Sequence, residues 1–343
     1  MLSNTYYKNK KIIVTGGAGF IGSNLVEKLV ELGAKILVID DLSTGKPENF
    51  PAHIKKEIIF QKTSILNLDQ LIELFKGYEL VFHLATQCVR LSINNPFIVH
   101  EVNTTGTLNV CQAALESNIK KLVYISSSEI YGNSGEELLS ESSKVEPSTI
   151  YGASKLAGEY YIKAFQEINN LECVIIRPFN TYGPKSHLKG VYGEVIPRFT
   201  LQLLNNMSPS IFGDGKQTRD FTYVLETATM ILKLATLSNI TVNLAYGQAV
   251  SINEIAQILA ELLDKKHIVP KHLEERPGDV KKLRADITLM KRLIDYTPTV
   301  NIKEGLGLYL NWFLKNHKNF SDLLENMPIK NWEINEESVK IKA

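Results

Sequence analysis

The sequence predicts an α/β fold in which a doubly wound parallel sheet is joined to a smaller, interleaved α/β domain. Short apolar runs rich in β-branched residues alternate with helix-length amphipathic stretches as far as Asn180. Strands that alternate with helices in this way pair in parallel. A glycine-rich turn joins the first run to the first helix. After Asn180, glycine, proline and basic residues become frequent, which indicates the start of a second domain.

The expected elements of the first part follow in chain order. Apolar runs of strand length predict buried strands at 11–15, 35–39, near 57–60, and at 80–85, 121–125 and 173–177. Helical spacing of apolar residues predicts helices at 23–32, 68–75, 103–116 and 151–165. His83 stands inside an apolar strand and is interpreted as a core histidine.

The second part is expected to interleave with the first. A strand at 242–244 is expected to return to the main sheet. Helices are expected at 251–263, where Ser251 and Glu254 form a capping box, and at 302–314. The predicted main domain is therefore 1–180 with a returning segment at about 220–246. The second domain comprises 181–219 and 247–330, and 331–343 form a polar tail without a motif.

Composition excludes several classes of partner. The 343 residues are 44% hydrophobic and carry a formal net charge of +1, without a basic run interleaved with aromatics, so we expect no nucleic-acid partner. No apolar run approaches the ~18 residues of a membrane span, and the lysine-rich residues 1–11 do not resemble a signal peptide. Cys88, Cys111 and Cys173 lack metal-ligand spacing. They are interpreted as reduced core thiols of a cytoplasmic protein without a metal.

The turn Gly16-Gly17-Ala18-Gly19-Phe20-Ile21-Gly22 lies between a predicted strand and a predicted helix, which is the setting of a Rossmann-type dinucleotide site. Its glycines allow a tight turn and let the backbone approach a pyrophosphate at the helix N-terminus. Asp40 follows the second strand. A carboxylate there can accept hydrogen bonds from the adenosine ribose and would repel a 2′-phosphate, which predicts NAD rather than NADP.

Tyr151 and Lys155 are four residues apart in a predicted helix and therefore share a face. A phenol has a pKa of about 10 and is a poor base at neutral pH. A fixed ammonium beside it would lower that pKa, so Tyr-x-x-x-Lys can build an acid/base group. A surface helix that carries both residues by chance is the alternative. The polar run 126–129 follows the fifth strand, at the sheet edge where ligands bind, although turn formation explains it equally.

Together these motifs resemble the extended short-chain dehydrogenase/reductase family, specifically its nucleotide-sugar epimerases (UDP-glucose 4-epimerase-like), dehydratases and decarboxylases. The resemblance covers about residues 11–314. It rests on five motifs in the family's order and spacing: Thr15-Gly-Gly-Ala-Gly-Phe-Ile-Gly22, Tyr151-x-x-x-Lys155, Arg177-Pro-Phe-Asn-x-Tyr-Gly-Pro184, Gly213-Asp-Gly-x-Gln-x-Arg-Asp-Phe221 and Arg276-Pro-Gly-Asp279.

The resemblance implies a role for each matching residue. Tyr151 would be the acid/base on a sugar hydroxyl, Lys155 would bind the nicotinamide ribose, and Ser127 would hydrogen-bond the same hydroxyl, with Glu129 as a further catalytic candidate. The implied contacts to NAD, besides Tyr151 and Lys155, are Gly16, Gly19, Phe20, Ile21, Gly22, Asp40, Ser64, Ile65, Leu84, Ala85, Asn103 and Pro178. The implied contacts to the sugar nucleotide are Ser128, Asn180, Val195, Phe212, Arg219 and, on the opposite wall, Arg276.

Two positions depart from the family. Ser64 stands where an Asp usually contacts adenine, and Cys88 stands where hexose epimerases often have a basic residue near the cofactor. Leu283 aligns where a large aromatic residue excludes N-acetyl groups in strict hexose epimerases, which favours room for an N-acetylhexosamine.

The implied reaction is the NAD-dependent 4-epimerisation of a UDP-hexose or UDP-N-acetylhexosamine through a 4-keto intermediate. A dehydratase or a UDP-glucuronic acid decarboxylase that uses Glu129 is the alternative, since Ser127-Ser128-Glu129 is similar to the Thr-Ser-Glu of the decarboxylases. A non-catalytic NAD-binding sensor is a remote alternative, because such proteins usually lose the Tyr or the Lys. Helices 103–116 and 151–165 resemble those that pair in family dimers, so a homodimer is expected.

Overall fold

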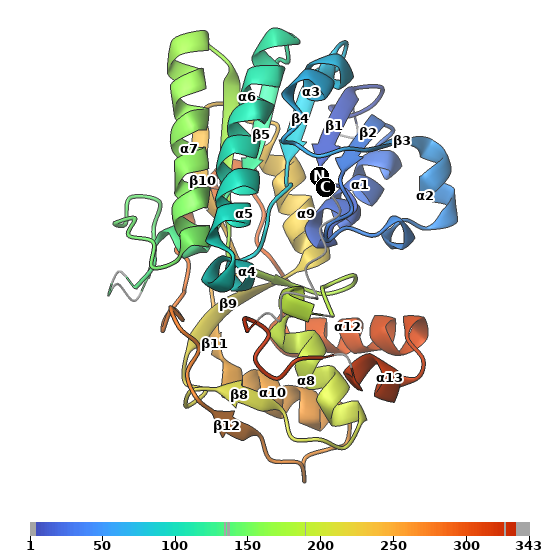
Figure 1. Cartoon of the computed structure of the whole chain (residues 1–343), viewed down its shortest axis with the longest axis vertical. Coiled ribbons are helices and arrows are strands. Elements are labelled where there is room, and N and C mark those ends of the chain that lie inside the picture. The colour runs from blue at the N-terminus through green and yellow to red at the C-terminus, as the bar shows by residue number, and fades with distance from the viewer. Residues whose placement is uncertain (1–4, 134, 136–137, 189, 326, 334–343) are drawn as a thin grey trace.

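The computed structural model describes residues 5–133, 135, 138–188, 190–325 and 327–333. At its centre lies a sheet of seven parallel strands in the order β10-β6-β5-β4-β1-β2-β3 (Figure 1). The bounds are β1 (Lys11–Thr15), β2 (Lys35–Asp40), β3 (Ile58–Lys62), β4 (Leu80–His83), β5 (Lys121–Ile125), β6 (Glu172–Pro178) and β10 (Ile240–Leu244). This confirms the predicted doubly wound α/β fold.

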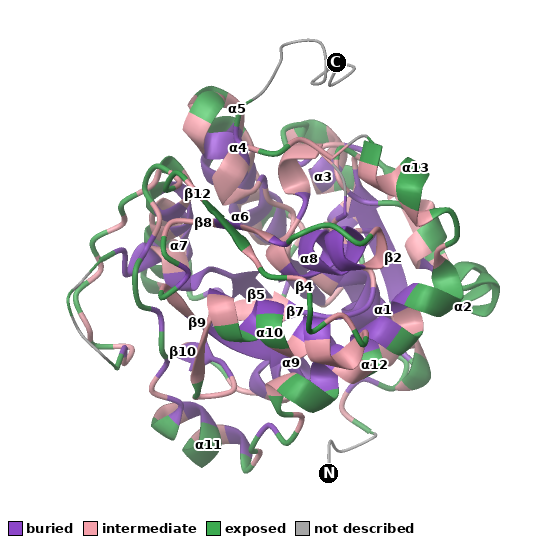
Figure 2. Cartoon of the chain, turned by 90° about the horizontal axis from the view of Figure 1, so that it is seen from below, coloured by how far each residue is buried: buried purple, intermediate pink, exposed green. Residues whose placement is uncertain are grey.

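Helices bury both faces of the sheet. Along β1, Ile12 and Val14 point into one core and Ile13 into the other, as expected of a strand covered on both sides. One layer contains α1 and α9, and the other contains α3, α6 and α7 (Figures 1 and 2). The helices of this half are α1 (Phe20–Glu31), α2 (Ala52–Glu57), α3 (Leu68–Phe75), α4 (Val89–Asn94), α5 (Pro96–His100), α6 (Gly106–Glu116), α7 (Ile150–Asn169), α9 (Val224–Leu234) and α11 (Thr288–Ile294).

The helix predicted at 103–116 does not begin at Asn103. The chain is helical from α5 through a π-helical turn, Glu101–Thr105, and into α6. Asn103 lies inside this turn and is buried. The apolar spacing of the sequence does not distinguish a π-turn from the α-helix on either side of it, although such turns often occur at functional sites.

Apart from α9, β10 and α11, the elements after β6 build a second layer beyond the carboxyl ends of the central strands (Figure 1). It contains a three-stranded sheet, β11-β9-β7, a two-stranded sheet, β12-β8, and a core of its own. Its elements are β7 (Asn180–Tyr182), α8 (Val195–Leu204), β8 (Ser210–Phe212), β9 (Thr218–Tyr223), β11 (Ala249–Ser251), α10 (Ile252–Leu262), β12 (Lys271–Leu273), α12 (Ile302–Asn316) and α13 (Phe320–Glu325). The capping box of Ser251 and Glu254 is confirmed. The domain boundaries given above stay a prediction.

The segment predicted to be a polar tail, 331–343, is packed where it begins. Asn331 and Trp332 are 5% and 4% exposed, and residues 334–343 lie outside the described residues. The polar composition did not indicate this packing, because a single aromatic residue among charged neighbours gives no periodic signal. Within the described part of the chain, every helix falls short of the length and apolarity that a membrane span needs.

Candidate active site

A cavity of about 420 Å³ lies where the carboxyl ends of the central strands face the second layer. Its walls come from the glycine turn after β1, the ends of β2, β4, β5 and β6, the start of α7, and segments around α8 and β9. The predicted site residues that line it are Gly16, Gly19, Phe20, Ile21, Gly22, Asp40, Ile65, Leu84, Ala85, Ser127, Ser128, Glu129, Tyr151, Lys155, Pro178, Asn180, Val195, Phe212, Arg219 and Arg276.

The glycine turn forms a cradle that side chains would fill. Gly16 has a φ of +68°, and a Cβ there would lie 2.6 Å from the main-chain nitrogen of Ala85. A Cβ on Gly22 would lie 2.2 Å from the carbonyl oxygen of Gly16. Helix α1 begins at the N-cap Gly19, with no side-chain cap and no acidic residue in its first turn. The N–H groups of that turn therefore suit an anion, and the cradle fits the pyrophosphate of a dinucleotide.

Asp40 ends β2 at the adjacent wall. Its carboxylate accepts hydrogen bonds from the main-chain nitrogens of Ala18 and Leu42, both at 2.9 Å. Burial raises the pKa of this carboxyl, and the two main-chain bonds lower it. A carboxylate offers about four lone-pair sites, so acceptor capacity remains for the two hydroxyls of a ribose.

Two predicted cofactor residues lie outside the cavity wall. The hydroxyl of Ser64 accepts a hydrogen bond from the main-chain nitrogen of Leu66 at 3.2 Å. This bond stabilises a local turn. Asn103 accepts from the main-chain nitrogen of Gln87 at 2.7 Å and donates to the hydroxyl of Ser154 at 3.0 Å. Asn103 therefore ties the loop after β4 to α7 and positions the wall of the cavity.

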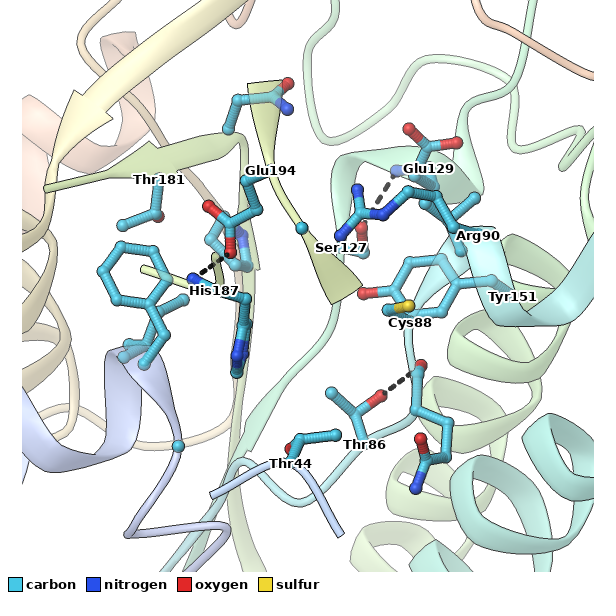
Figure 3. Close-up of a pocket in the computed structure, with 18 of the residues that line it drawn as sticks. Thr44, Thr86, Cys88, Arg90, Ser127, Glu129, Tyr151, Thr181, His187 and Glu194 are labelled. Carbon is cyan, nitrogen blue, oxygen red and sulfur yellow. Dashed lines mark hydrogen bonds between the residues drawn. The ribbon is translucent and has the colours of Figure 1, made fainter. Parts of the chain in front are cut away.

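Tyr151 lies at the start of α7, with its ring in the cavity beside Ser127 (Figure 3). The hydroxyl of Ser127 lies beside the phenol (Figure 3) and lowers its pKa. Burial raises the pKa of Tyr151 to about 12; the Ser127 hydroxyl and the charge of Arg90 lower the pKa, whereas Glu129 raises it. In this surrounding the phenol is protonated at neutral pH.

Lys155 lies on the same helix and lines the same cavity. Its side chain is 2% exposed, and burial lowers its pKa to about 7, while the carboxylate of Glu159 raises it. Its Nζ lies 4.5 Å from the centre of the Tyr124 ring. The role of Lys155 in lowering the pKa of Tyr151 stays a prediction. The sequence showed the spacing of the pair but not this burial.

Glu129 also lines the cavity, close to Arg90 in Figure 3. Burial raises the pKa of its carboxyl, and the charges of Arg219, Arg276 and Arg90 lower it. A buried carboxyl with a raised pKa is suited to hold and release a proton. Glu129 therefore remains a candidate for acid/base chemistry of its own.

The far part of the cavity presents hydrogen-bonding groups for an anionic, polar ligand. The amide oxygen of Asn180 is buried and has no hydrogen-bond partner among the described residues. Arg219 donates to the carboxylate of Asp279 at 2.7 Å, and Arg276 pairs with the same oxygen. The expectation that the two arginines stand on opposite walls is therefore wrong, since one carboxylate holds both. Two guanidinium groups against one carboxylate leave an excess of positive charge, which suits a diphosphate.

Sequence reasoning missed Arg90 and Glu194, which also line the cavity. Arg90 donates to the carbonyl oxygens of Val191 at 2.8 Å and Tyr192 at 2.7 Å, so it joins the start of α4 to the residues that precede α8. Glu194 is the N-cap of α8 and lies across the cavity from Tyr151 in Figure 3. Burial raises the pKa of Glu194 to about 7, and Arg90 lowers it. Neither residue belongs to a motif; the place of Glu194 just before a helix was the one available signal.

The structure also bears on the predictions made for Cys88, Leu283 and His83. Cys88 is half-buried and lines the cavity, so it is not a core thiol, whereas the other two cysteines are buried. Leu283 is fully buried in the main core and does not line the cavity, so it does not set the room for an N-acetyl group. His83 is a core histidine as predicted, with both ring nitrogens bonded to threonine hydroxyls.

Known proteins are similar to this chain in sequence and in fold. The model of a family described as the NAD dependent epimerase/dehydratase family matches residues 12–245. A putative UDP-glucose 4-epimerase of Methanocaldococcus jannaschii is 36% identical over 90% of this chain and 99% of its own length. A UDP-N-acetyl-alpha-D-glucosaminuronate decarboxylase of Bacillus cytotoxicus is 33% identical over 89% and 98%. The structure of a UDP-N-acetylglucosamine 4-epimerase from Methanobrevibacter ruminantium, solved with UDP-N-acetylmuramic acid, superposes with a TM-score of 0.85 at 36% identity, over 90% of this chain and 100% of that one.

Proposed function

Because the chain belongs to the NAD-dependent epimerase/dehydratase family, we propose that it is a 4-epimerase of a UDP-hexose or UDP-N-acetylhexosamine that reuses NAD within each turnover. The observation that carries the proposal is the phenol of Tyr151, which lies beside the Ser127 hydroxyl in the same cavity as the glycine cradle (Figure 3). Relatives named as 4-epimerases of UDP-glucose and of UDP-N-acetylglucosamine support both substrate classes.

The residues of the cavity have different roles in this reaction. Bound NAD would accept the hydrogen of the sugar C4 as hydride and later return it, which is the redox chemistry the cofactor supplies. Tyr151 takes the proton of the C4 hydroxyl, and Ser127 bonds the same oxygen and orients the phenol. When the 4-keto sugar turns over between the two steps, the proton returns from Tyr151 to the oxygen on the inverted carbon. Asn180 and Arg219 hold the nucleotide while the sugar turns.

The residues beside Tyr151 favour an epimerase over a lyase. A dehydratase must protonate a departing hydroxyl, and this chain has Ser128 where the resembling dehydratases have Asp. A serine hydroxyl is a far weaker proton donor at neutral pH than a carboxylic acid. Glu129 keeps a decarboxylase or dehydratase as the alternative, and a decarboxylase is among the relatives.

Proton NMR of the purified protein with UDP-glucose, UDP-N-acetylglucosamine and UDP-glucuronic acid, each separately, tests the proposal. New sugar signals at unchanged mass are expected with at least one of the first two. Loss of water or carbon dioxide would instead assign a lyase. Tyr151→Phe should lower turnover by about 10²–10⁴-fold and retain NAD. Retained turnover in that variant would refute the mechanism.

We further propose that the protein is a homodimer that pairs through α5, α6 and α7. Large apolar side chains are exposed on all three helices: Phe97 by 80%, Leu108 by 39% and Tyr160 by 58%. Both α5 and α6 contact α7, and in Figure 1 they follow one another along its length. A second copy of the same surface would remove these side chains from water. In sedimentation equilibrium, Phe97→Glu should dissociate the dimer and the control Ile59→Glu, on the edge strand β3, should not; a monomeric parent protein would refute the proposal.

We also place the protein in the cytoplasm. Its three cysteines form no disulfide, and free thiols are typical of a reducing compartment. Fractionation of the source cells, with immunodetection of the protein, tests this placement; recovery from an extracellular or periplasmic fraction would refute it.

A further inference from the structure

The chain crosses one side of the cavity with a short C-terminal segment, residues 328–333, which we call the strap. Arg198 on α8 donates to the carbonyl oxygens of Pro328 at 3.0 Å and Ile329 at 2.7 Å. Asn331 in turn donates to the carbonyl oxygen of Gly193 at 2.8 Å. These bonds join the strap to the N-terminal half of α8 and to the residue before its N-cap, so the strap is fixed against the second layer.

Trp332 brings an aromatic ring from the strap to the cavity wall. It packs against Phe212 at the end of β8, with ring centres 4.5 Å apart and ring planes at 74°. The guanidinium of Arg198 lies 5.9 Å from the centre of the same Phe212 ring. An edge-to-face pair of this kind fixes the orientation of both rings. Trp332 thus sets the ring plane of Phe212, and both rings belong to one wall.

The position of the strap fits the nucleotide part of a ligand and not the reacting part. Two segments form the cavity wall near Phe212. Helix α8 contributes Arg198, and the segment entering β9 contributes Gln217 and Arg219. The strap has no bond to Tyr151, Ser127 or Lys155 among the described residues. It also lies beyond residue 245, where the match to the family model ends.

We propose that the strap is the outer wall of the nucleobase site, where Phe212 and Trp332 together bind the planar base of a nucleoside diphosphate. The proposal rests on the proposed function, which supplies a UDP-sugar as the ligand, and it assigns one part of that ligand to the strap. A flat heterocycle gains stacking contact with aromatic side chains. Because Trp332 comes from the strap, base binding depends on a segment far from the catalytic residues in sequence.

Fluorescence of Trp332 tests the contact directly. The chain has two tryptophans, and Trp312 on α12 does not line the cavity. In the Trp312→Phe variant all tryptophan emission therefore comes from Trp332. UDP should quench or shift that emission, with half-saturation at the Kd that calorimetry gives for UDP, whereas inorganic phosphate should not change it. If saturating UDP leaves the emission of Trp332 unchanged in the Trp312→Phe variant, the proposal is refuted. This result does not depend on whether variants of Trp332 itself fold.

Truncation of the ring tests its contribution to binding. Trp332→Ala should raise the Kd for UDP and the KM for the UDP-sugar by about 10-fold or more, while kcat stays within about 3-fold and the NAD content is unchanged. The matched control Trp312→Ala removes the same side chain away from the cavity and should leave both constants within 2-fold. Equal effects of the two variants, or a Kd unchanged in Trp332→Ala, would show that Trp332 has a structural role alone.

The same experiments separate this proposal from the proposed function. If the protein turns over a UDP-sugar but Trp332 does not respond to UDP, the strap proposal alone is refuted. If UDP quenches Trp332 and no sugar is epimerised, the strap proposal stands and the proposed reaction falls. A parent protein that binds no UDP would refute both.

Discussion

Replacing Ser127 by alanine should slow turnover by about 10- to 150-fold and leave NAD binding intact. The Ser127 hydroxyl lowers the pKa of Tyr151 against the burial that raises it to about 12. The ionised phenol is the form that takes the proton from the sugar. Loss of the bond therefore raises the pKa further and reduces the ionised fraction at any pH below it.

The magnitude follows from the energy of one hydrogen bond to a charged group, about 1.5–3 kcal/mol. Each ~1.4 kcal/mol corresponds to a factor of ten in rate. The same hydroxyl also accepts from the main-chain nitrogen of Glu129 at 3.2 Å, a bond of a single 3-10 turn. Its loss should lower the free energy of unfolding by no more than about 1 kcal/mol, so the variant remains folded.

The assay is the pH dependence of kcat for the parent protein, Ser127→Ala and Ser127→Thr. The alanine variant should have the lower kcat at every pH well below the pKa of the phenol, and the threonine variant, which keeps a hydroxyl, should resemble the parent. The effect should vanish in a Tyr151→Phe background, because the phenol is then absent. A kcat within 3-fold of the parent across this pH range would refute this reasoning.

Three further predictions concern other parts of the molecule. Gly22→Ala should release NAD on purification, because a Cβ there would lie 2.2 Å from the carbonyl oxygen of Gly16; absorbance of the denatured supernatant measures the cofactor, and full NAD content would contradict the cradle. Glu159→Gln should lower the free energy of unfolding in urea by about 3–5 kcal/mol, because Glu159 binds Arg177 through both oxygens with neither side chain more than 4% exposed; a loss below 1 kcal/mol would contradict it. Burial raises the pKa of Glu194 to about 7, with Arg90 and the peptide nitrogen of His187 lowering it, so the carboxyl is neutral below that pH and charged above it. The KM for the UDP-sugar should therefore rise as the pH passes 7, and Glu194→Gln should remove that rise; an unchanged pH profile of KM would contradict this role.

The fold could be read from the sequence because its signals are local. The apolar run of β1, the glycine turn and the start of α1 are consecutive in the chain, and such a turn needs glycine for steric reasons alone. The pairing of Tyr151 with Lys155 was equally local, since helical spacing fixes a shared face. The π-helical turn around Asn103 could not be predicted from the sequence, because the apolar spacing is the same in a π-turn and in an α-helix.

The site was only partly readable, because its chemistry depends on burial. The sequence located Tyr151 and Lys155 but not the burial that raises the pKa of the phenol and lowers that of the ammonium. Arg219 and Arg276 were identified, but the carboxylate of Asp279 joins Arg219 on β9 to the loop that carries Arg276. No spacing rule predicts the contact between that strand and that loop.

The sequence by itself determined the alternation of strands and helices, the glycine turn and the shared face of Tyr151 and Lys155, because each depends on residues close together in the chain. Only the tertiary structure decided which groups surround the phenol, that Arg90 and Glu194 belong to the cavity, and that Trp332, distant in sequence, contacts Phe212. The physical reason is that protonation and recognition depend on desolvation and on contacts between distant segments, and both arise only when the chain has packed.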